Sequence, residues 1–303
     1  MYFYLALAYD NDRETEKALE TLDDGLGATY ERDKEAYARL LTKKSEILYE
    51  QHMYACYTAV GEEVAELEED PGEKAARIVR LAYAYYQVYN DEKAGEMFER
   101  AFDEFAGLSE EEKAPHIRRL YDNYAEFLRF AKHDPEAGLE YNEKAFAADA
   151  GIVTPGRYAG EEQHMEAFRA RVRLARAYRY AGQDRKAENL SRNTLAWRSG
   201  GKGMKRLFKG SSAQYGSACS DFMIGECLYG IRDYSRAIEF LERAVVRAKE
   251  DSGCPKGICF EALFTLMLIA MAKGDKEAAK VYYRQVLDIA PDRDYCAASS
   301  LFE

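Results

Sequence analysis

A pattern of small and large apolar residues recurs seven times along this 303-residue chain and restricts its fold more than any other feature. Each copy centres on an alanine, and in the clearer copies a ring or a leucine lies nine residues before it and another lies four after it. In the stretch from 81 to 102, for example, Ala94 lies between Tyr85 and Phe98. The seven central alanines are Ala18, Ala55, Ala94, Ala137, Ala187, Ala237 and Ala279. A small residue also precedes the centre by twelve positions in five copies, so two apolar stripes flank each turn.

These spacings predict a pair of antiparallel helices in each copy, because residues three and four apart share one face of a helix. The turn between the stripes reads "YNDEK", "GQDRK" or "KGDKE", where Gly ends one helix and Asp or Asn caps the next. The composition agrees, with only 6 Pro, and the 24 Tyr must find places between helices. One hairpin cannot bury both of its stripes, so the copies are expected to stack into an all-α solenoid.

The pattern resembles the tetratricopeptide repeat, a helical hairpin of about 34 residues. The last copy is the clearest, and its matching positions are Leu266, Gly274, Ala279, Tyr283, Val286 and Pro291. The resemblance implies a single right-handed α-solenoid of about seven hairpins over residues 1–303. The expected repeats are 1–30, 33–70, 74–108, 114–149, 165–198, 215–250 and 256–291, with loop insertions at 149–162 and 198–217. Because Met1 falls within the first expected helix, without a cap, we also expect the chain to be a piece of something longer.

The charge of the chain is unevenly distributed. Residues 165–210 carry a net charge of +10, whereas the whole chain carries −11, so the remainder carries −21. A field of this kind steers charged partners and influences assembly.

The resemblance also implies that the first helix of each repeat lines a concave groove, read at positions i, i+3, i+7 and i+10. That groove would be aromatic before the middle, basic at the middle and apolar toward the C-terminus. The candidate groove residues are Tyr83, Tyr86, Arg119, Asn123, Glu126, Arg129, Arg169, Arg173, Arg176, Arg179, Phe222, Glu226 and Tyr229. An extended or helical peptide with acidic and apolar side chains would suit such a groove.

Two narrower interpretations of these residues stay open. In the first, the arginines pair with acidic residues of adjacent repeats and only hold the stack together. In the second, they belong to the clamp with which some proteins of this family hold a terminal carboxylate. Asn123, Arg169 and Arg173 fall on the last three clamp positions, but Val79 and Tyr83 occupy the first two and cannot replace a Lys and an Asn. The sequence therefore predicts at most half of that clamp.

The function expected from the resemblance is a non-catalytic scaffold that binds a protein or peptide, as the sensor or assembly part of a regulator. Gram-positive regulators that resemble it combine such repeats with an upstream DNA-binding helix-turn-helix, and no such segment is visible here. The alternative is RNA binding through residues 165–210, where basic residues are interleaved with Tyr178, Tyr180, Trp197 and Phe208. The overall charge of −11 makes nucleic acid the less favoured partner. A third possibility is self-association, in which the basic middle docks on an acidic end of another copy.

Sequence motifs for catalysis or cofactor binding are missing. There is no G-x-S-x-G, no H-E-x-x-H and no GxxxxGK[ST], and the four His and six Cys do not form a zinc pattern. We therefore expect no catalytic residues, no metal and no cofactor. No apolar run approaches the roughly 20 residues that a membrane helix needs. The scattered cysteines are typical of reduced thiols, so we expect a cytoplasmic protein.

Overall fold

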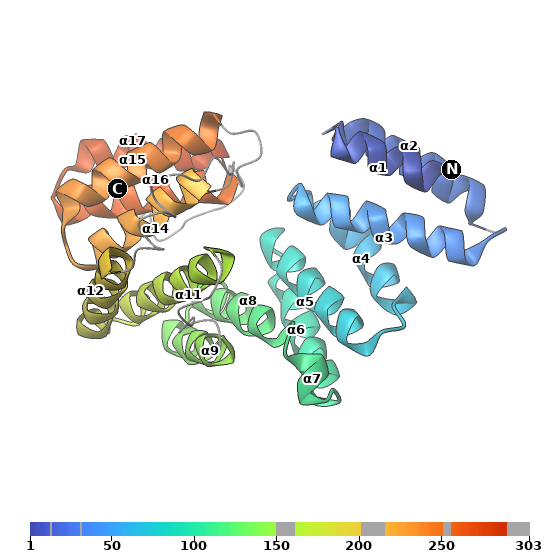
Figure 1. The fold of residues 1–303 in the computed structure, drawn as a ribbon, viewed down its shortest axis with the longest axis horizontal. Helices are drawn as coiled ribbons and strands as arrows, with labels where there is room; N and C mark the ends of the chain where they lie inside the picture. Colours follow the sequence, from blue (N-terminus) through green and yellow to red (C-terminus); the bar gives the residue numbers. More distant parts are fainter. Residues whose placement is uncertain (13, 31, 150–160, 201–215, 251–255, 290–303) are drawn as a thin grey trace. The chain divides into compact units, whose positions relative to one another are not determined.

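Fifteen α-helices and no strand form the part of the chain that the computed structural model describes, namely residues 1–12, 14–30, 32–149, 161–200, 216–250 and 256–289 (Figure 1). Fourteen of these helices form seven hairpins: α1 (Tyr2–Asn11) with α2 (Thr15–Thr29), α3 (Lys34–Glu50) with α4 (Tyr54–Leu67), α5 (Pro71–Gln87) with α6 (Asp91–Ala106), α8 (Ile117–Phe130) with α9 (Pro135–Ala148), α11 (Glu161–Tyr180) with α12 (Asp184–Gly200), α14 (Gly216–Gly230) with α15 (Tyr234–Glu250), and α16 (Lys256–Ala272) with α17 (Lys276–Ile289). The short α7 (Glu110–Lys113) lies between the third and fourth hairpins. The predicted all-α repeat fold is confirmed. Among the described helices, none is both long and apolar enough to cross a membrane.

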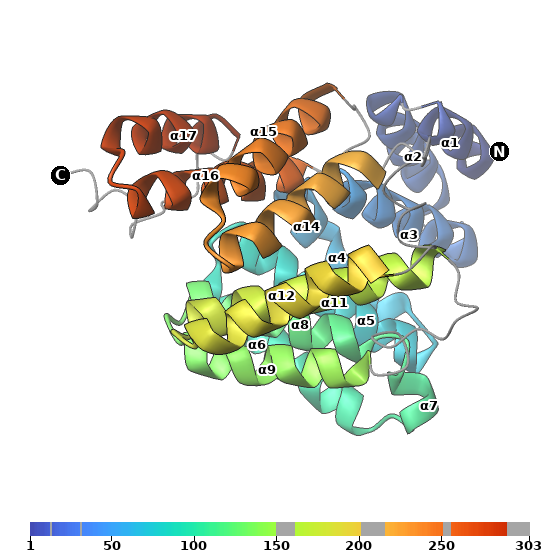
Figure 2. The same ribbon diagram turned by 60° about the vertical axis from the view of Figure 1, so that its left-hand side comes forward.

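The helices divide into two compact units, Met1–Ala148 (unit 1) and Asp149–Glu303 (unit 2). In each unit the second helix of a hairpin packs on its own first helix and on the first helix of the next hairpin, as Figure 2 shows for α12, α14, α15 and α16. The first helices also contact one another: α1 with α3, α5 with α8, α11 with α14, and α14 with α16. Each unit therefore contains walls of adjacent first helices. A single solenoid over residues 1–303 and its handedness stay predictions.

Six of the seven hairpin turns share one backbone conformation. The residue two positions before the first residue of the second helix has a positive φ, between 54° and 75°, in each of them. These residues are His52, Tyr89, His133, Gly182, Arg232 and Gly274. Glycine, which adopts this conformation without steric cost, provides it in only two of the six turns. The expected caps also form, since Asn90, Asp233 and Asp275 each accept a hydrogen bond from a backbone N–H three residues later.

Close helix crossings determine which residues of the second helices are buried. The third, seventh and tenth residues after each helix start face the partner helix, as Ala94, Phe98 and Ala101 do in α6, where all three are fully buried. Two of the expected central alanines are wrong: Ala55 is exposed and Ala137 is only half-buried. The correct central residues are Tyr57 in α4 and Gly138 in α9, because they lie three positions beyond the starts of their helices.

The α4 crossing reverses the usual order of sizes. Tyr57 is 2% exposed at the position where five of the other hairpins have alanine, and Gly61 stands where most of them have a large residue. A methyl group added to Gly61 would lie 2.8 Å from Cδ1 of Leu81 and 3.3 Å from the ring of Tyr57. The tyrosine therefore fills the volume that a large residue at position 61 would otherwise occupy.

The tyrosines of unit 1 lie mostly between helices, as expected. Tyr124 packs edge-on against Tyr141 and Phe102, with ring centroids 4.7 and 4.9 Å apart, and both Phe98 and Phe127 contact it. Unit 2 has a more aliphatic core, in which the largest fully buried side chains are Phe168, Leu241, Leu263 and Leu266. Most of the two expected insertions, at 149–162 and 198–217, lies outside the described residues.

Candidate binding surface on the first helices

Arg176 and Arg179 of α11 in unit 2 are held by acidic side chains of the next two first helices. Glu226 of α14 is buried, with 1% of its side chain exposed. Its carboxylate forms ion pairs with Nε of Arg176 at 3.2 Å and with Nη2 of Arg179 at 2.9 Å. It also accepts a hydrogen bond from the hydroxyl of Thr265 on α16 at 2.5 Å. Arg176 also pairs with Glu261 of α16. We call these five residues the Glu226 network, and it links α11, α14 and α16.

The electrostatics of this network favour the charged form of Arg176. Burial alone would lower the pKa of Arg176, but Glu261 and Glu226 raise that pKa well above its usual value. The guanidinium of Arg176 also lies 5.8 Å from the ring centroid of Phe222, and that of Arg179 lies 4.3 Å from the ring of Tyr229. Burial raises the pKa of Tyr229 to about 12. Five candidate groove residues therefore come together: Arg176, Arg179, Phe222, Glu226 and Tyr229. The two arginines pair with acids of the same unit, which is the arrangement expected if the arginines hold adjacent repeats together.

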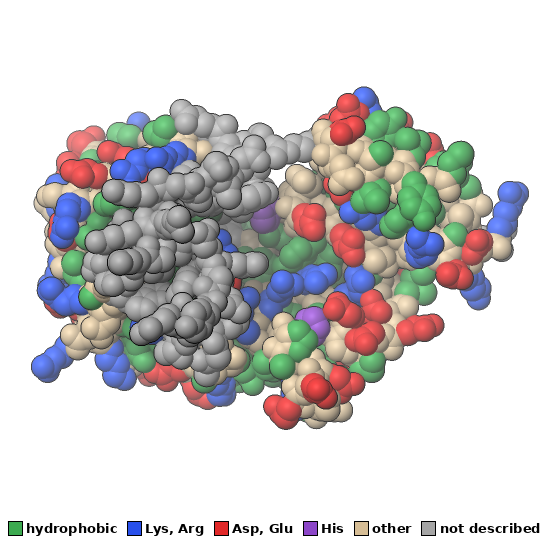
Figure 3. All heavy atoms as spheres, viewed as in Figure 1, with side chains coloured by type: hydrophobic (Ala, Val, Ile, Leu, Met, Phe, Trp, Pro, Cys, Tyr) green, Lys and Arg blue, Asp and Glu red, His purple; other side chains and the backbone are tan. Residues whose placement is uncertain are grey.

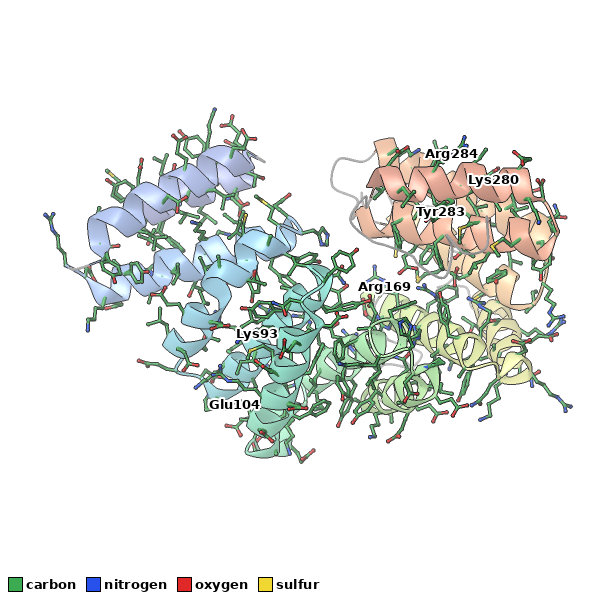
Figure 4. All side chains as sticks on the ribbon, turned by 180° about the vertical axis from the view of Figure 1, so that it is seen from behind. Lys93, Glu104, Arg169, Lys280, Tyr283 and Arg284 are labelled. Atoms are coloured by element: carbon green, nitrogen blue, oxygen red, sulfur yellow. The ribbon has the colours of Figure 1, made fainter. Side chains whose placement is uncertain are left out.

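The remaining arginine candidates of α11 also have partners. Arg169, labelled in Figure 4, pairs with Glu166 and donates to Sγ of Cys219 at 3.6 Å. Burial would lower the pKa of Arg169, but Cys219 and Glu166 raise it overall. Arg173 lies 3.8 Å from a carboxylate oxygen of Asp149. The clamp prediction combines these two arginines with Asn123 of unit 1, so it stays a prediction.

Two neighbouring first-helix arginines of unit 1, Arg80 and Arg119, lack an acidic partner among the described residues. Arg80 lies on α5 and Arg119 on α8, and these two helices pack together. Within the described part of the chain, neither guanidinium makes an ion pair or a hydrogen bond, and Nε of Arg80 is buried without a partner. The nearby arginines differ, because Arg77 binds Glu68 at 2.8 Å and Arg118 contacts Asp122 at 3.0 Å.

The charges of Arg80 and Arg119 act on each other and on the same tyrosine. Partial burial lowers the pKa of Arg119, the positive charge of Arg80 lowers it further, and Glu73 acts in the opposite direction. Burial raises the pKa of Tyr49 on α3, while Arg119 and Arg80 both oppose that rise. Tyr49, Arg80 and Arg119 therefore interact electrostatically across three first helices. We call these three residues the Arg80–Arg119 site.

Aromatic rings border this site. Tyr83 lies 5.9 Å from Tyr54 and 6.0 Å from Tyr86, and Tyr86 lies 6.1 Å from Phe127, measured between ring centroids. Tyr83 and Tyr86 are half-buried, so each retains exposed ring surface. Figure 3 shows Lys and Arg side chains gathered over α5 and α8, with acidic and apolar side chains around them.

The other candidates of α8 lie further along the same helix. Asn123 is half-buried, and its Nδ2 is enclosed without a hydrogen bond. Arg129 donates to Oδ1 of Asn142 on α9 at 2.6 Å, and Glu126 is half-buried. Arg129 therefore helps to hold its own hairpin together.

The expectation from sequence missed Arg80 and Tyr49. Counted at i, i+3, i+7 and i+10 up to Tyr83 and Tyr86, the groove positions of α5 would begin at Ala76 and Val79, but these are 2% and 1% exposed and belong to the core. The surface stripe passes through Arg80 and Tyr83 instead. Small residues mark the buried crossing of these hairpins, and Ala82 is that residue in α5. Counting the groove positions from the residues beside Ala82, rather than from Ala76, would have placed Arg80 on the surface.

Comparisons with known proteins agree on the architecture. Residues 260–293, which contain α17 and most of α16, match the family model for the tetratricopeptide repeat. The chain has the tetratricopeptide-repeat fold. A Rap protein complexed with Competence and Sporulation Factor is similar at a TM-score of 0.65 and 15% identity, over 95% of this chain and 73% of that one.

A second tetratricopeptide-repeat structure is also similar, the STAND protein with a tetratricopeptide repeat sensor from Pyrococcus horikoshii. Its TM-score is 0.52 at 15% identity, over 97% of this chain and 40% of that protein. A search among curated proteins finds no match. Proteins with tetratricopeptide repeats are in general interaction scaffolds that bind proteins or peptides, rather than enzymes.

Proposed function

We propose that this protein is a non-catalytic scaffold that binds a protein or peptide along the first helices of its repeats. The observation that carries the proposal is the surface of unit 1, where Arg80 and Arg119 lack acidic partners and half-exposed Tyr83 and Tyr86 border them. Arginine and tyrosine dominate the binding energy of many interfaces. A partner segment with acidic and apolar side chains would complement both features.

Two structural neighbours support this proposal by analogy. The Rap structure contains Competence and Sporulation Factor, and the Pyrococcus horikoshii protein uses its tetratricopeptide repeats as a sensor. By the same analogy, the present protein serves as the sensor or assembly part of a cytoplasmic regulator. The partner contacts are proposed to involve Asn123 and Glu126 as well, since they lie on the same helix as Arg119.

The alternative of RNA binding through residues 165–210 has less support. Four of the described arginines in this segment, Arg169, Arg173, Arg176 and Arg179, face acidic side chains or a thiol of their own unit. A guanidinium already paired with a carboxylate has less to gain from a phosphate. Trp197 and Phe208, which that interpretation also uses, have side chains outside the described residues. Self-association through the same segment stays a prediction, and salt-dependent light scattering would test it.

Peptide selection tests the proposed function. The full chain is immobilised and used to select binders from a random library of short peptides, and an unrelated helical protein serves as the reference. We expect enriched peptides that lose binding to Tyr83→Ala but keep binding to Tyr30→Ala, a ring that is 64% exposed at the end of α2. If no peptide binds more strongly than to the reference protein, the proposed function is wrong.

A further inference from the structure

We propose that the Arg80–Arg119 site binds a side-chain carboxylate, from Asp or Glu, of the partner peptide. This inference rests on the proposed function and names the chemical group that the surface recognises. It is distinct from the carboxylate clamp considered above, because Arg80 and Tyr49 lie outside the clamp positions.

The first argument is that several of the other first-helix arginines have acidic partners within this protein, although Arg39 instead lies over the ring of Phe3. Arg77 has Glu68, Arg118 has Asp122, and Arg176 has Glu226 and Glu261. Arg80 and Arg119 have no carboxylate within reach among the described residues. A buried polar atom without a partner, such as Nε of Arg80, is rare in folded proteins and calls for an explanation.

The second argument is the mutual repulsion of the two guanidiniums. The positive charge of Arg80 lowers the pKa of Arg119, and the two residues come from helices α5 and α8, which pack together. An anion between them would remove this repulsion and accept hydrogen bonds from both forks. The free protein therefore carries an unfavourable arrangement that binding of an acid relieves.

The third argument concerns the neutral donor beside the pair. The hydroxyl of Tyr49 makes no hydrogen bond within the described residues, and it is protonated at neutral pH, since burial raises its pKa further above the ordinary value of about 10. A carboxylate has two oxygens with about four acceptor positions, so it can accept from two guanidiniums and one hydroxyl.

The negative charges around the site favour a carboxylate over a phosphate. Glu73 raises the pKa of Arg119 and Glu126 raises the pKa of Tyr49, so two carboxylates already act on members of the site. A singly charged group suits this balance better than a phosphate, which carries close to two negative charges at neutral pH.

The test uses pairs of synthetic peptides with amidated C-termini, in which leucine and alanine surround either one Glu or one Gln. Binding to the full chain is measured by fluorescence anisotropy. We expect the Glu peptides to bind more tightly, and the double variant Arg80→Gln/Arg119→Gln to weaken their binding about 10- to 100-fold. The control Lys93→Gln/Arg100→Gln removes the same charge from α6, where both residues already have acidic partners, and should change binding less than about 2-fold.

Each other outcome has a separate meaning. Equal binding of Glu and Gln peptides, or unchanged binding by the double variant, would overturn the carboxylate site and leave the scaffold proposal in place. Tighter binding of phosphoserine peptides than of Glu peptides, or binding that requires a free C-terminus, would also overturn it. If no peptide binds any form of the protein, the proposed function itself fails. Circular dichroism of each variant confirms that it is folded.

Discussion

The first helices of both units carry arginines, but a pair in unit 1 and a pair in unit 2 differ in whether they have acidic partners. In unit 2, Arg176 and Arg179 share the buried carboxylate of Glu226, and Glu261 supplies a second acid. In unit 1, the charges of Arg80 and Tyr49 act on Arg119, and neither arginine has a directly paired acid among the described residues. The packing of the hairpins follows the same rules in both units, so the difference lies in the placement of acidic residues.

The comparison teaches how one repeat architecture can use the same residue type for two purposes. A buried ion pair with additional hydrogen bonds fixes the position of neighbouring helices, and it is costly to break. An unpaired arginine pair contributes nothing favourable to the free protein but is ready for an acidic partner. The total charge of a segment, such as +10 for residues 165–210, does not distinguish these two purposes.

The largest expected effect concerns the Glu226 network. Arg176→Gln leaves Glu226 and Glu261 buried or half-buried without their shared cation, and we expect the free energy of unfolding to fall by about 3–5 kcal/mol. Urea unfolding followed by circular dichroism measures the change. The matched control is Arg192→Gln, which breaks an exposed pair with Glu188 and should cost less than about 0.5 kcal/mol. Equal losses in the two variants would remove the structural role that we assign to unit 2.

A smaller effect tests whether the two units share one mode of packing. A methyl group at Gly138 in unit 1 would lie 2.8 Å from the carbonyl oxygen of Ala125, and one at Gly225 in unit 2 would lie 2.6 Å from Cγ of Leu241. We expect each Gly→Ala change to cost about 1–3 kcal/mol in thermal or urea unfolding. Gly27→Ala is the control: it has no neighbour within 4 Å, and should stabilise its helix by about 0.5–1 kcal/mol. A loss of stability in the variant of one unit alone would show that the helix crossings of the two units are not equivalent.

The sequence predicted this packing well because helix crossings depend on local spacing. Ala94 and Ala237 mark buried crossings, and Asp275 caps its helix, as their positions in the repeat required. The errors at Ala55 and Ala137 have a local cause as well, since the helix start defines the crossing and alanine is only its commonest occupant.

The charge pairing could not be predicted in the same way. Arg176 meets Glu226, 50 residues later, and Glu261, 85 residues later, and no local period relates these positions. Whether an arginine is paired depends on which side chains of three successive repeats face one another. Arg119 and Arg176 were therefore both predicted as groove residues from sequence, although Arg176 has two acidic partners and Arg119 has no paired acid among the described residues.

Alkaline pH provides a smaller test of the surroundings of Arg80. Burial raises the pKa of Tyr57 to about 12, while Arg80 opposes that rise. Since the pKa of tyrosine in the unfolded chain is about 10, the resulting stability is present below pH 10 and is lost as pH rises from about 10 to about 12. Between neutral pH and pH 11, we expect the free energy of unfolding to fall by about 1 kcal/mol less in Tyr57→Phe than in the unchanged protein.

The same titration reports on Arg80 directly. Ultraviolet absorbance of tyrosinate should show that Arg80→Gln delays ionisation to higher pH, because a positive neighbour of Tyr57 and Tyr49 is lost. The control Arg100→Gln on α6 should leave the curve unchanged. An unaltered titration in Arg80→Gln would mean that Arg80 is not close to these rings.

The most direct test of the difference between the units compares the two arginine pairs in one unfolding experiment. Urea unfolding of Arg80→Gln/Arg119→Gln is measured beside that of Arg176→Gln, without any ligand. The account predicts that the unit 1 double variant keeps its stability or gains up to about 1 kcal/mol, because repulsion and desolvation are relieved, whereas the unit 2 variant loses several kcal/mol. Comparable losses in both would contradict it, since Arg80 and Arg119 would then support the fold as Arg176 does.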